Sequence, residues 1–151
     1  MIGYFFLLLA ANQIPERMDT KELKETMNSL YGSSDEPLSI YFSPGRVNLI
    51  GEHTDYNGGY VLPCALSFGT YLLVRRNGSR MVHFATTNFD HRGEADLDAP
   101  FQKAGRSWIN YPLGVLDEFR KMAHEIEGVD LLYSGDIPNG AGLSSSASIE
   151  M

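Results

Sequence analysis

The chain has 151 residues, enough for one domain, and its hydrophobic content of 43% and charged content of 21% are typical of a globular protein. Its net charge is −7 and its basic residues are scattered, which argues against a nucleic-acid partner because phosphate neutralisation needs clustered lysine and arginine. The single cysteine, Cys64, excludes an internal disulfide and favours a reducing compartment, so we expect a cytoplasmic protein with this side chain buried in the apolar run VLPCAL.

An apolar run lies close to the N-terminus, from Tyr4 to Ala11. It is far shorter than the ~20 residues that span a bilayer. The first basic residue, Arg17, follows the run, whereas a secretory signal has basic residues before it. We therefore expect neither a membrane anchor nor a signal peptide.

A short amphipathic helix is predicted after Met18, ending at Gly32, with Leu23, Met27 and Leu30 on its apolar face. We hypothesise that Met18 is the natural start and that residues 1–17 are a non-native or disordered extension. Residues 18–37 are then an N-terminal helix and its connector.

The most unusual stretch is PGRVNLIGEHTDYNGG, residues 44–59, which combines polar side chains of opposite chemistry with four glycines. Each glycine would cost a helix about 1 kcal/mol, and consecutive polar groups do not suit a two-faced strand. We predict a loop between strands at residues 38–42 and 60–66. Its carboxylates accept and its imidazole and guanidinium donate, which favours a polyhydroxylated or anionic small molecule. An ordinary hairpin tip is the alternative, because Asn-Gly-Gly is a turn signal.

The middle of the chain predicts an antiparallel hairpin, with strands at residues 70–76 and 80–89 joined by the Asn-Gly-Ser turn at 77–79. His83 and His91 are isolated and are interpreted as structural or solvated. Apolar residues at intervals of three and four predict a helix from about Tyr111 to residue 126, closed by Gly128. A buried strand is predicted at residues 129–135.

A second polar segment, DIPNGAGLSSSASIEM, follows that strand. Glycines let backbone amides approach a ligand, and a following helix N-terminus favours negative charge, so the segment is typical of a phosphate site. A P-loop is excluded because the segment has no lysine. A dinucleotide fingerprint is excluded because Ser145 stands where it requires glycine.

Residues 138–147, PNGAGLSSSA, resemble the nucleotide loop P-x-x-x-G-L-S-S-S-A of the GHMP small-molecule kinases. Residues 45–59, GRVNLIGEHTDYNGG, resemble the signature of the galactokinase branch of that family. The resemblance implies an α+β fold, a mixed β-sheet backed by helices, in the ribosomal-protein-like two-layer N-terminal domain. Residues 38–151 would form an incomplete copy of this domain, and the C-terminal domain would be absent.

The resemblance also implies a role for each matching residue. Arg46 would stabilise the transition state, and four residues would bind the sugar hydroxyls: Glu52, His53, Thr54 and Asp55. The ATP phosphates would lie on Gly140, Ala141, Gly142, Leu143, Ser144, Ser145 and Ser146, with Ser146 also a Mg²⁺ ligand. Further nucleotide contacts are placed near Thr86, Thr87, Asn88 and Trp108, although Trp108 is equally interpretable as a core residue at the start of a helix.

The implied reaction is transfer of the ATP γ-phosphate to the C1 hydroxyl of galactose, with ATP and Mg²⁺ as cofactors and no protein partner. In the family the catalytic aspartate and a magnesium-binding glutamate belong to segments beyond Met151, so we expect this chain alone to be inactive. Two alternatives remain: a non-catalytic sugar and ATP sensor, or a sister kinase acting on N-acetylgalactosamine, galacturonate or arabinose.

Overall fold

The computed structural model describes residues 19–51, 53–54, 57–103, 105, 107–137 and 145–151, without the side chains of 145–147. The described elements, in chain order, are α1 (Thr20–Tyr31), β1 (Leu38–Ile50), β2 (Leu62–Arg76), β3 (Met81–Thr86), β4 (Gly93–Asp96), α2 (Asn110–Lys121), β5 (Val129–Gly135) and α3 (Ser145–Glu150). The expectation about residues 1–17 lies outside them. None of the described helices is long and apolar enough to cross a membrane.

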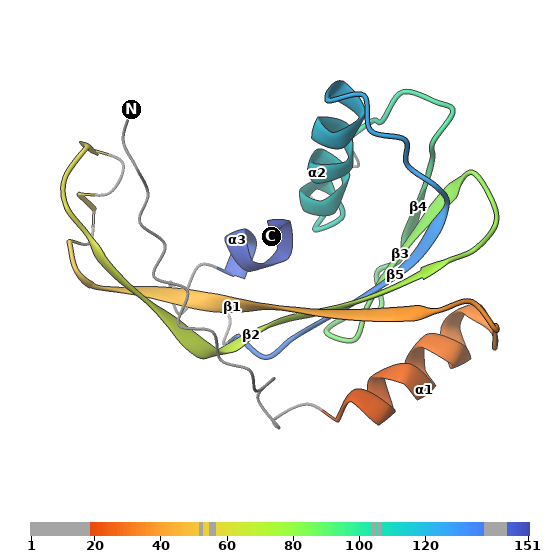
Figure 1. Cartoon of the computed structure of the whole chain (residues 1–151), viewed down its shortest axis with the longest axis horizontal. Coiled ribbons are helices and arrows are strands. Elements are labelled where there is room, and N and C mark those ends of the chain that lie inside the picture. The colour runs from red at the N-terminus through yellow and green to blue at the C-terminus, as the bar shows by residue number, and fades with distance from the viewer. Residues whose placement is uncertain (1–18, 52, 55–56, 104, 106, 138–144) are drawn as a thin grey trace.

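The strands form one mixed sheet in the order β1-β2-β5-β3-β4, with β3 and β5 parallel and the other neighbours antiparallel. Figure 1 shows α2 and α3 on one face of this sheet and α1 on the other. The predicted α+β fold with a mixed sheet backed by helices is confirmed. The two-layer description is extended by α1, which adds a layer on the second face.

Helix α1 follows the prediction from its apolar spacing. Asp19 caps its first turn, where the carboxylate accepts from the backbone N–H of Lys21 at 2.8 Å. Gly32, with a φ of +79°, ends it. Leu23 and Met27 are buried against β2 and β5.

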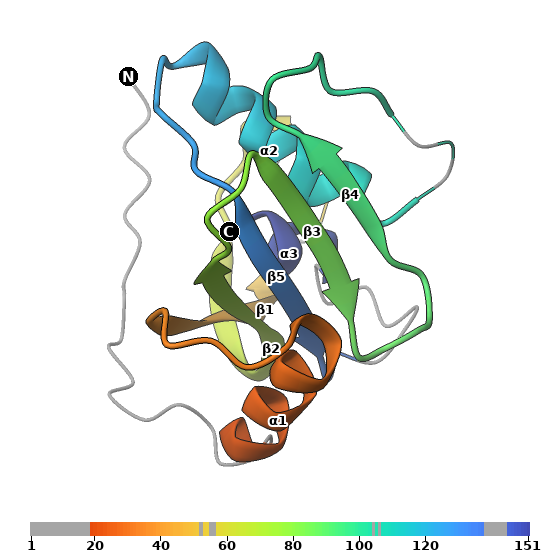
Figure 2. The ribbon, with the colours of Figure 1, turned by 90° about the vertical axis from the view of Figure 1, so that its right-hand side faces the viewer.

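The predicted hairpin of residues 70–89 is wrong, because β5 lies between β2 and β3 (Figure 2). Instead, the turn between β2 and β3 is hydrogen-bonded to Gly128, the residue before β5. Asn77 N–H donates to the Gly128 carbonyl, and Gly128 N–H donates to the Ser79 carbonyl, both at 3.1 Å. A Cβ on Gly128 would lie only 2.3 Å from that Ser79 oxygen. Residue 128 must therefore be a glycine for β5 to begin between β2 and β3.

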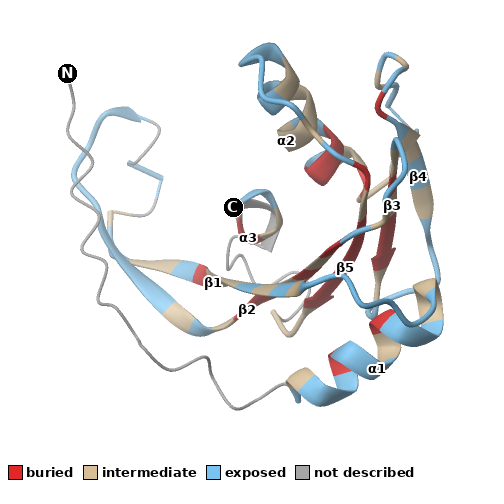
Figure 3. Cartoon of the chain, turned by 45° about the vertical axis from the view of Figure 1, so that its right-hand side comes forward, coloured by how far each residue is buried: buried red, intermediate tan, exposed pale blue. Residues whose placement is uncertain are grey.

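Each central strand divides its side chains between two cores, because successive residues point to opposite faces. Leu131 and Tyr133 pack with Val82 and Phe84 beneath α2, whereas Leu132 packs against α1. Figure 3 shows these buried residues concentrated in β5, β3 and the adjoining half of β2. The core therefore lies at one end of the sheet.

The other end of the sheet is a long exposed hairpin made by β1 and β2 (Figure 1). Residues 44–50, predicted as loop, continue β1 and pair with residues 62–69, with irregularities between Pro44 and Arg46 and between Asn48 and Ile50. These bulges let proline and glycine remain within a paired strand. Cys64 lies in this hairpin and is exposed, so its predicted burial is also wrong.

Helix α2 is shorter than predicted, since it ends at Lys121 rather than near Gly128. Ala123 has a φ of +59°, and its N–H donates to the Arg120 carbonyl at 3.0 Å. His124 N–H donates to the Phe119 carbonyl at 3.1 Å. These two bonds satisfy carbonyls of the last turn of α2, and Ala123 takes the left-handed conformation that glycine usually adopts at a helix end.

A buried ion pair ties α1 to the sheet. The side chains of Arg75 and Asp130 are 4% and 6% exposed, and the Arg75 guanidinium donates to the carboxylate at 3.2 Å. The same guanidinium donates to the carbonyl of Gly32 at the end of α1 at 3.0 Å. The second carboxylate oxygen accepts from the Asn77 amide at 3.0 Å and lies 2.8 Å from His83 Nδ1.

Candidate active site

Arg46 lies on β1 just past the bulge at Pro44, in the exposed hairpin and paired with Ala65 of β2. Its guanidinium is thus carried on a paired strand, which gives it a fixed backbone. Of the four residues predicted to bind sugar, His53 and Thr54 are described at the hairpin tip. Glu52 and Asp55 lie outside the described residues.

Thr54 organises the hairpin tip. Its hydroxyl oxygen lies 2.6 Å from the Gly51 carbonyl and 3.2 Å from the Tyr60 carbonyl, and its own carbonyl accepts from Asn57 and Gly59. Gly51 has a φ of +93°, and a Cβ there would lie 2.3 Å from the Tyr60 oxygen. The Thr54 hydroxyl proton is therefore used within the loop, while sugar binding by Thr54 stays a prediction.

His53 has a φ of +64°, a conformation that costs a non-glycine residue about 1–2 kcal/mol. The Asn57 side-chain amide donates to the His53 carbonyl at 2.8 Å and helps hold this turn. Residues 57–59 thus lie in the connection between β1 and β2, at the position where the alternative interpretation expected a turn. The role of His53 in ligand binding remains a prediction.

Most of the predicted phosphate segment, Gly140 to Ser144, lies outside the described residues. Ser145 and Ser146 begin α3, although nothing of their side chains is described. Both ends of the segment are placed: Asp136 follows β5, and Ser148 of α3 is buried. The sequence pattern did not identify either residue, but both belong to the same DIPNGAGLSSSAS run.

The sheet register relates the starts of the two predicted motifs. Ser43 pairs with Thr70 across β1 and β2, and Thr70 pairs with Gly135 across β2 and β5. The stretch carrying Arg46 begins just after Ser43, and the phosphate segment begins just after Gly135. The start of the phosphate segment and the part of β1 that leads to Arg46 therefore lie in neighbouring positions of the sheet, although about ninety positions separate them in the sequence.

Residues 86–88 support the same end of β5. The Asn88 side chain donates to the Gly135 carbonyl at 2.7 Å and accepts from the Gly135 N–H at 2.9 Å. The Thr87 hydroxyl is hydrogen-bonded to Ser134, and the Thr86 hydroxyl accepts from the Asn88 N–H at 3.2 Å. These predicted nucleotide-side residues thus lie beside the start of the phosphate segment, and direct nucleotide contact stays a prediction.

Trp108 has the features of a core residue before α2. Its indole N–H donates to the His91 carbonyl at 3.2 Å, and its ring meets Tyr133 edge-on at a centroid distance of 5.5 Å. It also packs against the core beneath α2. These contacts favour the core interpretation, and a nucleotide contact remains untested.

Tyr71 follows Thr70 in β2 and is buried. Burial, and secondarily the Asp136 carboxylate, raise the pKa of this phenol, which packs in the core beneath α1. Within the described ranges no three His, Cys, Asp or Glu side chains gather as a metal site.

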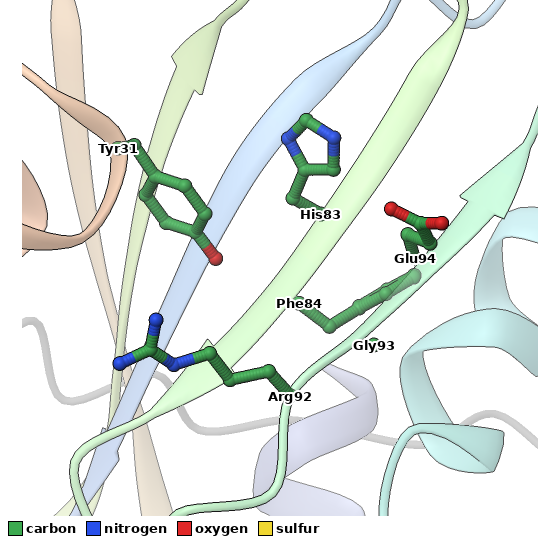
Figure 4. A pocket seen from close by; sticks show the side chains of 6 residues that line it. All are labelled: Tyr31, His83, Phe84, Arg92, Gly93 and Glu94. Carbon is green, nitrogen blue, oxygen red and sulfur yellow. The ribbon is translucent and has the colours of Figure 1, made fainter.

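A hollow lies on the face of the sheet that α1 covers. It is lined by six residues, shown in Figure 4: Tyr31, His83, Phe84, Arg92, Gly93 and Glu94. Tyr31 ends α1, and its hydroxyl donates to the Leu131 carbonyl at 3.1 Å. Burial raises the pKa of this phenol to about 12. We assign the hollow no part in ligand binding.

Comparison with known proteins identifies the same two segments. Residues 27–76 match the family model described as the galactokinase galactose-binding signature, and residues 110–151 match that of the GHMP kinases N terminal domain. The galactokinase of Bacillus subtilis is 49% identical over 134 residues, and that of Clostridium acetobutylicum 55% over 116 residues. These alignments cover 87% and 75% of this chain but 34% and 30% of the relatives.

Solved structures agree in fold. A Lactococcus lactis galactokinase complexed with galactose superposes with a TM-score of 0.82 at 42% identity, over 88% of this chain and 35% of that one. The mevalonate kinase of Methanococcus jannaschii gives a TM-score of 0.62 at 19% identity, over 78% of this chain and 38% of the other, which is a likeness of fold alone. The chain spans about a third of the length of the curated relatives it matches.

Proposed function

This chain belongs to the galactokinase family of GHMP kinases, and from that premise we propose that the complete protein transfers the ATP γ-phosphate to the C1 hydroxyl of galactose, giving galactose 1-phosphate. The observation that carries the proposal is the register Ser43–Thr70–Gly135, because Arg46 follows Ser43 along β1 and the phosphate motif follows Gly135 at the end of β5. We propose that an acceptor held on the sugar motif meets a phosphoryl donor held on the phosphate motif near Arg46. The solved relative with galactose bound supports the sugar class.

Arg46 is the residue we propose to act on the transferring group. It projects from the paired strand β1 past Ser43, and a guanidinium can neutralise charge that develops on phosphoryl oxygens. Phosphoryl transfer depends mainly on positioning and charge neutralisation, so a fixed arginine is suited to it. Glu52, His53, Thr54 and Asp55 are proposed to hold the sugar hydroxyls.

ATP is the proposed donor, with its phosphates on Gly140 to Ser146. Mg²⁺ is proposed to be held mainly by phosphate oxygens, with Ser146 as a protein ligand, since Mg²⁺ commonly binds through substrate phosphates and few protein groups. The ion neutralises phosphate charge when bound. We further propose a cytoplasmic location and no obligatory protein partner.

The test is a kinase assay on the complete reading frame that contains this chain, with ATP, Mg²⁺ and a panel of galactose, N-acetylgalactosamine, galacturonate and arabinose. We expect the highest kcat/KM with galactose, and no useful activity from the 151-residue chain alone. Preference for another sugar replaces the substrate proposal. No ATP consumption with any sugar of the panel overturns the kinase proposal.

Arg46→Met should lower kcat by about 100- to 1,000-fold, the usual cost of removing one charge-stabilising donor. Arg76→Met is the matched control, because Arg76 is also exposed on this hairpin's strand β2 and pairs with Glu127 at the far end of the sheet. Equal kcat values for the two variants would contradict the role of Arg46.

A further inference from the structure

Both ends of the segment from residue 137 to residue 147 are fastened to two consecutive residues of β2. At its start, the Asp136 carboxylate accepts from the Gly69 N–H at 2.7 Å, and the Asp136 N–H donates to the Gly69 carbonyl at 3.1 Å. At its end, Ser148 Oγ lies 2.8 Å from Thr70 Oγ1 and 2.8 Å from the Ser43 carbonyl. We call these contacts the clasp.

The Ser148 end of the clasp is buried, and the clasp is closely packed at Gly69. Ser148 is 4% exposed and Thr70 6%, so water does not compete for their hydroxyls. Gly69 allows the strands to meet, since a Cβ there would lie 2.3 Å from the Ser43 carbonyl and 2.6 Å from the Phe42 ring. This contact therefore has little freedom to shift.

The clasp also reaches the strand that carries Arg46. Ser43 and Pro44 are the β1 partners of Thr70 and Gly69, and the irregularity before Arg46 follows at once. Ser148 hydrogen-bonds across both strands, because it contacts the carbonyl of one and the hydroxyl of the other. A displacement of the segment's ends relative to Arg46 requires breaking these bonds.

We propose that Asp136 and Ser148 are positioning residues that fix the phosphate segment relative to Arg46. The proposal rests on the proposed function, in which that segment holds the phosphoryl donor. Neither side chain needs to touch substrate. Because transfer requires donor and acceptor to be aligned within about an ångström, loss of the clasp should lower kcat more than it weakens binding of the sugar.

The experiment uses the complete protein and the variants Ser148→Ala, Thr70→Val, their double variant and Asp136→Ala. Removing one neutral hydrogen bond should lower kcat about 3- to 10-fold, and Asp136→Ala about 10- to 100-fold because its bond is charge-assisted. The KM for galactose should stay within about 2-fold of wild type. The double variant should be no slower than the slower single variant, since the contact that Thr70→Val removes is already absent in Ser148→Ala.

Ser39→Ala and Asp35→Ala are the matched controls, being exposed positions on β1 and on the connector before it. All rates are normalised to the folded fraction, so that a purely structural defect leaves kcat unchanged. Unchanged kcat, or additive losses in the double variant, overturns the proposal. If Ser148→Ala does not fold, Thr70→Val carries the same test, since it removes only one of the two bonds.

Amide hydrogen exchange separates this proposal from the proposed function, because it needs no sugar. Residues 137–147 should exchange several-fold faster in Ser148→Ala and Asp136→Ala than in wild type and in the two controls. If these variants exchange faster but the protein phosphorylates no sugar, the positioning role of the clasp is supported and only the proposed reaction is overturned. Exchange equal to wild type overturns the clasp even in an active galactose kinase.

Discussion

Asp130→Asn is expected to lower the free energy of unfolding by about 3–5 kcal/mol, the cost of removing one partner from a buried ion pair. The substitution keeps the shape of the side chain but leaves the buried Arg75 guanidinium without its counter-charge. It also places an amide N–H₂ among donors, because the carboxylate now accepts from Asn77 and Arg75 and lies beside His83. A loss of this size is a large part of the ~5–15 kcal/mol that stabilises a typical domain.

Urea unfolding of the chain, followed by circular dichroism, measures the effect. With a urea dependence of about 1–3 kcal/mol per molar, the midpoint should fall by about 2 M. Asp98→Asn is the matched control: Arg80 donates to Asp98 at 2.8 Å, yet this carboxylate is 63% exposed, so its midpoint should stay at the wild-type value. A shift under about 0.5 M in Asp130→Asn would refute the reasoning about burial.

Three further outcomes follow from the fold. Burial opposes ionisation of Asp130, but its hydrogen-bond donors prevail and lower its pKa. The contribution of Asp130 to stability is therefore present above about pH 4 and is lost as pH falls through the folded-state pKa. Asp130→Asn should make the free energy of unfolding less dependent on pH in this acidic range. Ala123→Gly should raise the free energy of unfolding by about 1 kcal/mol in urea titrations, because the residue has a φ of +59°, and an unchanged midpoint contradicts this. Gly69→Ala should cost about 3 kcal/mol by overpacking against Ser43, and a thermal midpoint equal to wild type would exclude that clash.

Local signals predicted local structure well. Helix α1 was predicted from apolar spacing and from Gly32, both of which act within a few residues of one another. The turn at Asn77 was also present, but the pairing it suggested was wrong. A turn signal cannot show that residues fifty positions later will enter between its two strands, as β5 does beside Gly128.

For the candidate site too, the local features were predictable from the sequence and the long-range ones were not. The two motifs were recognised because their unusual residues are consecutive, and Arg46 was among them. The proximity of their starts was not predictable, since it depends on the register of Ser43 with Thr70 and of Thr70 with Gly135. Residues 44–50 were predicted as loop because an exposed strand with bulges has neither the apolar alternation nor the composition of a core strand.

The position of β5 in the sheet has a consequence for biosynthesis. The strand that joins β1–β2 to β3–β4 is made after all four of them, so a growing chain holds two separate hairpins until Val129–Gly135 emerges from the ribosome. Until then β2 and β3 each present an unpaired edge, which is the surface on which nascent chains associate wrongly. Slower translation before residue 129 should therefore increase the demand for chaperones, whereas slower translation after residue 135 should not.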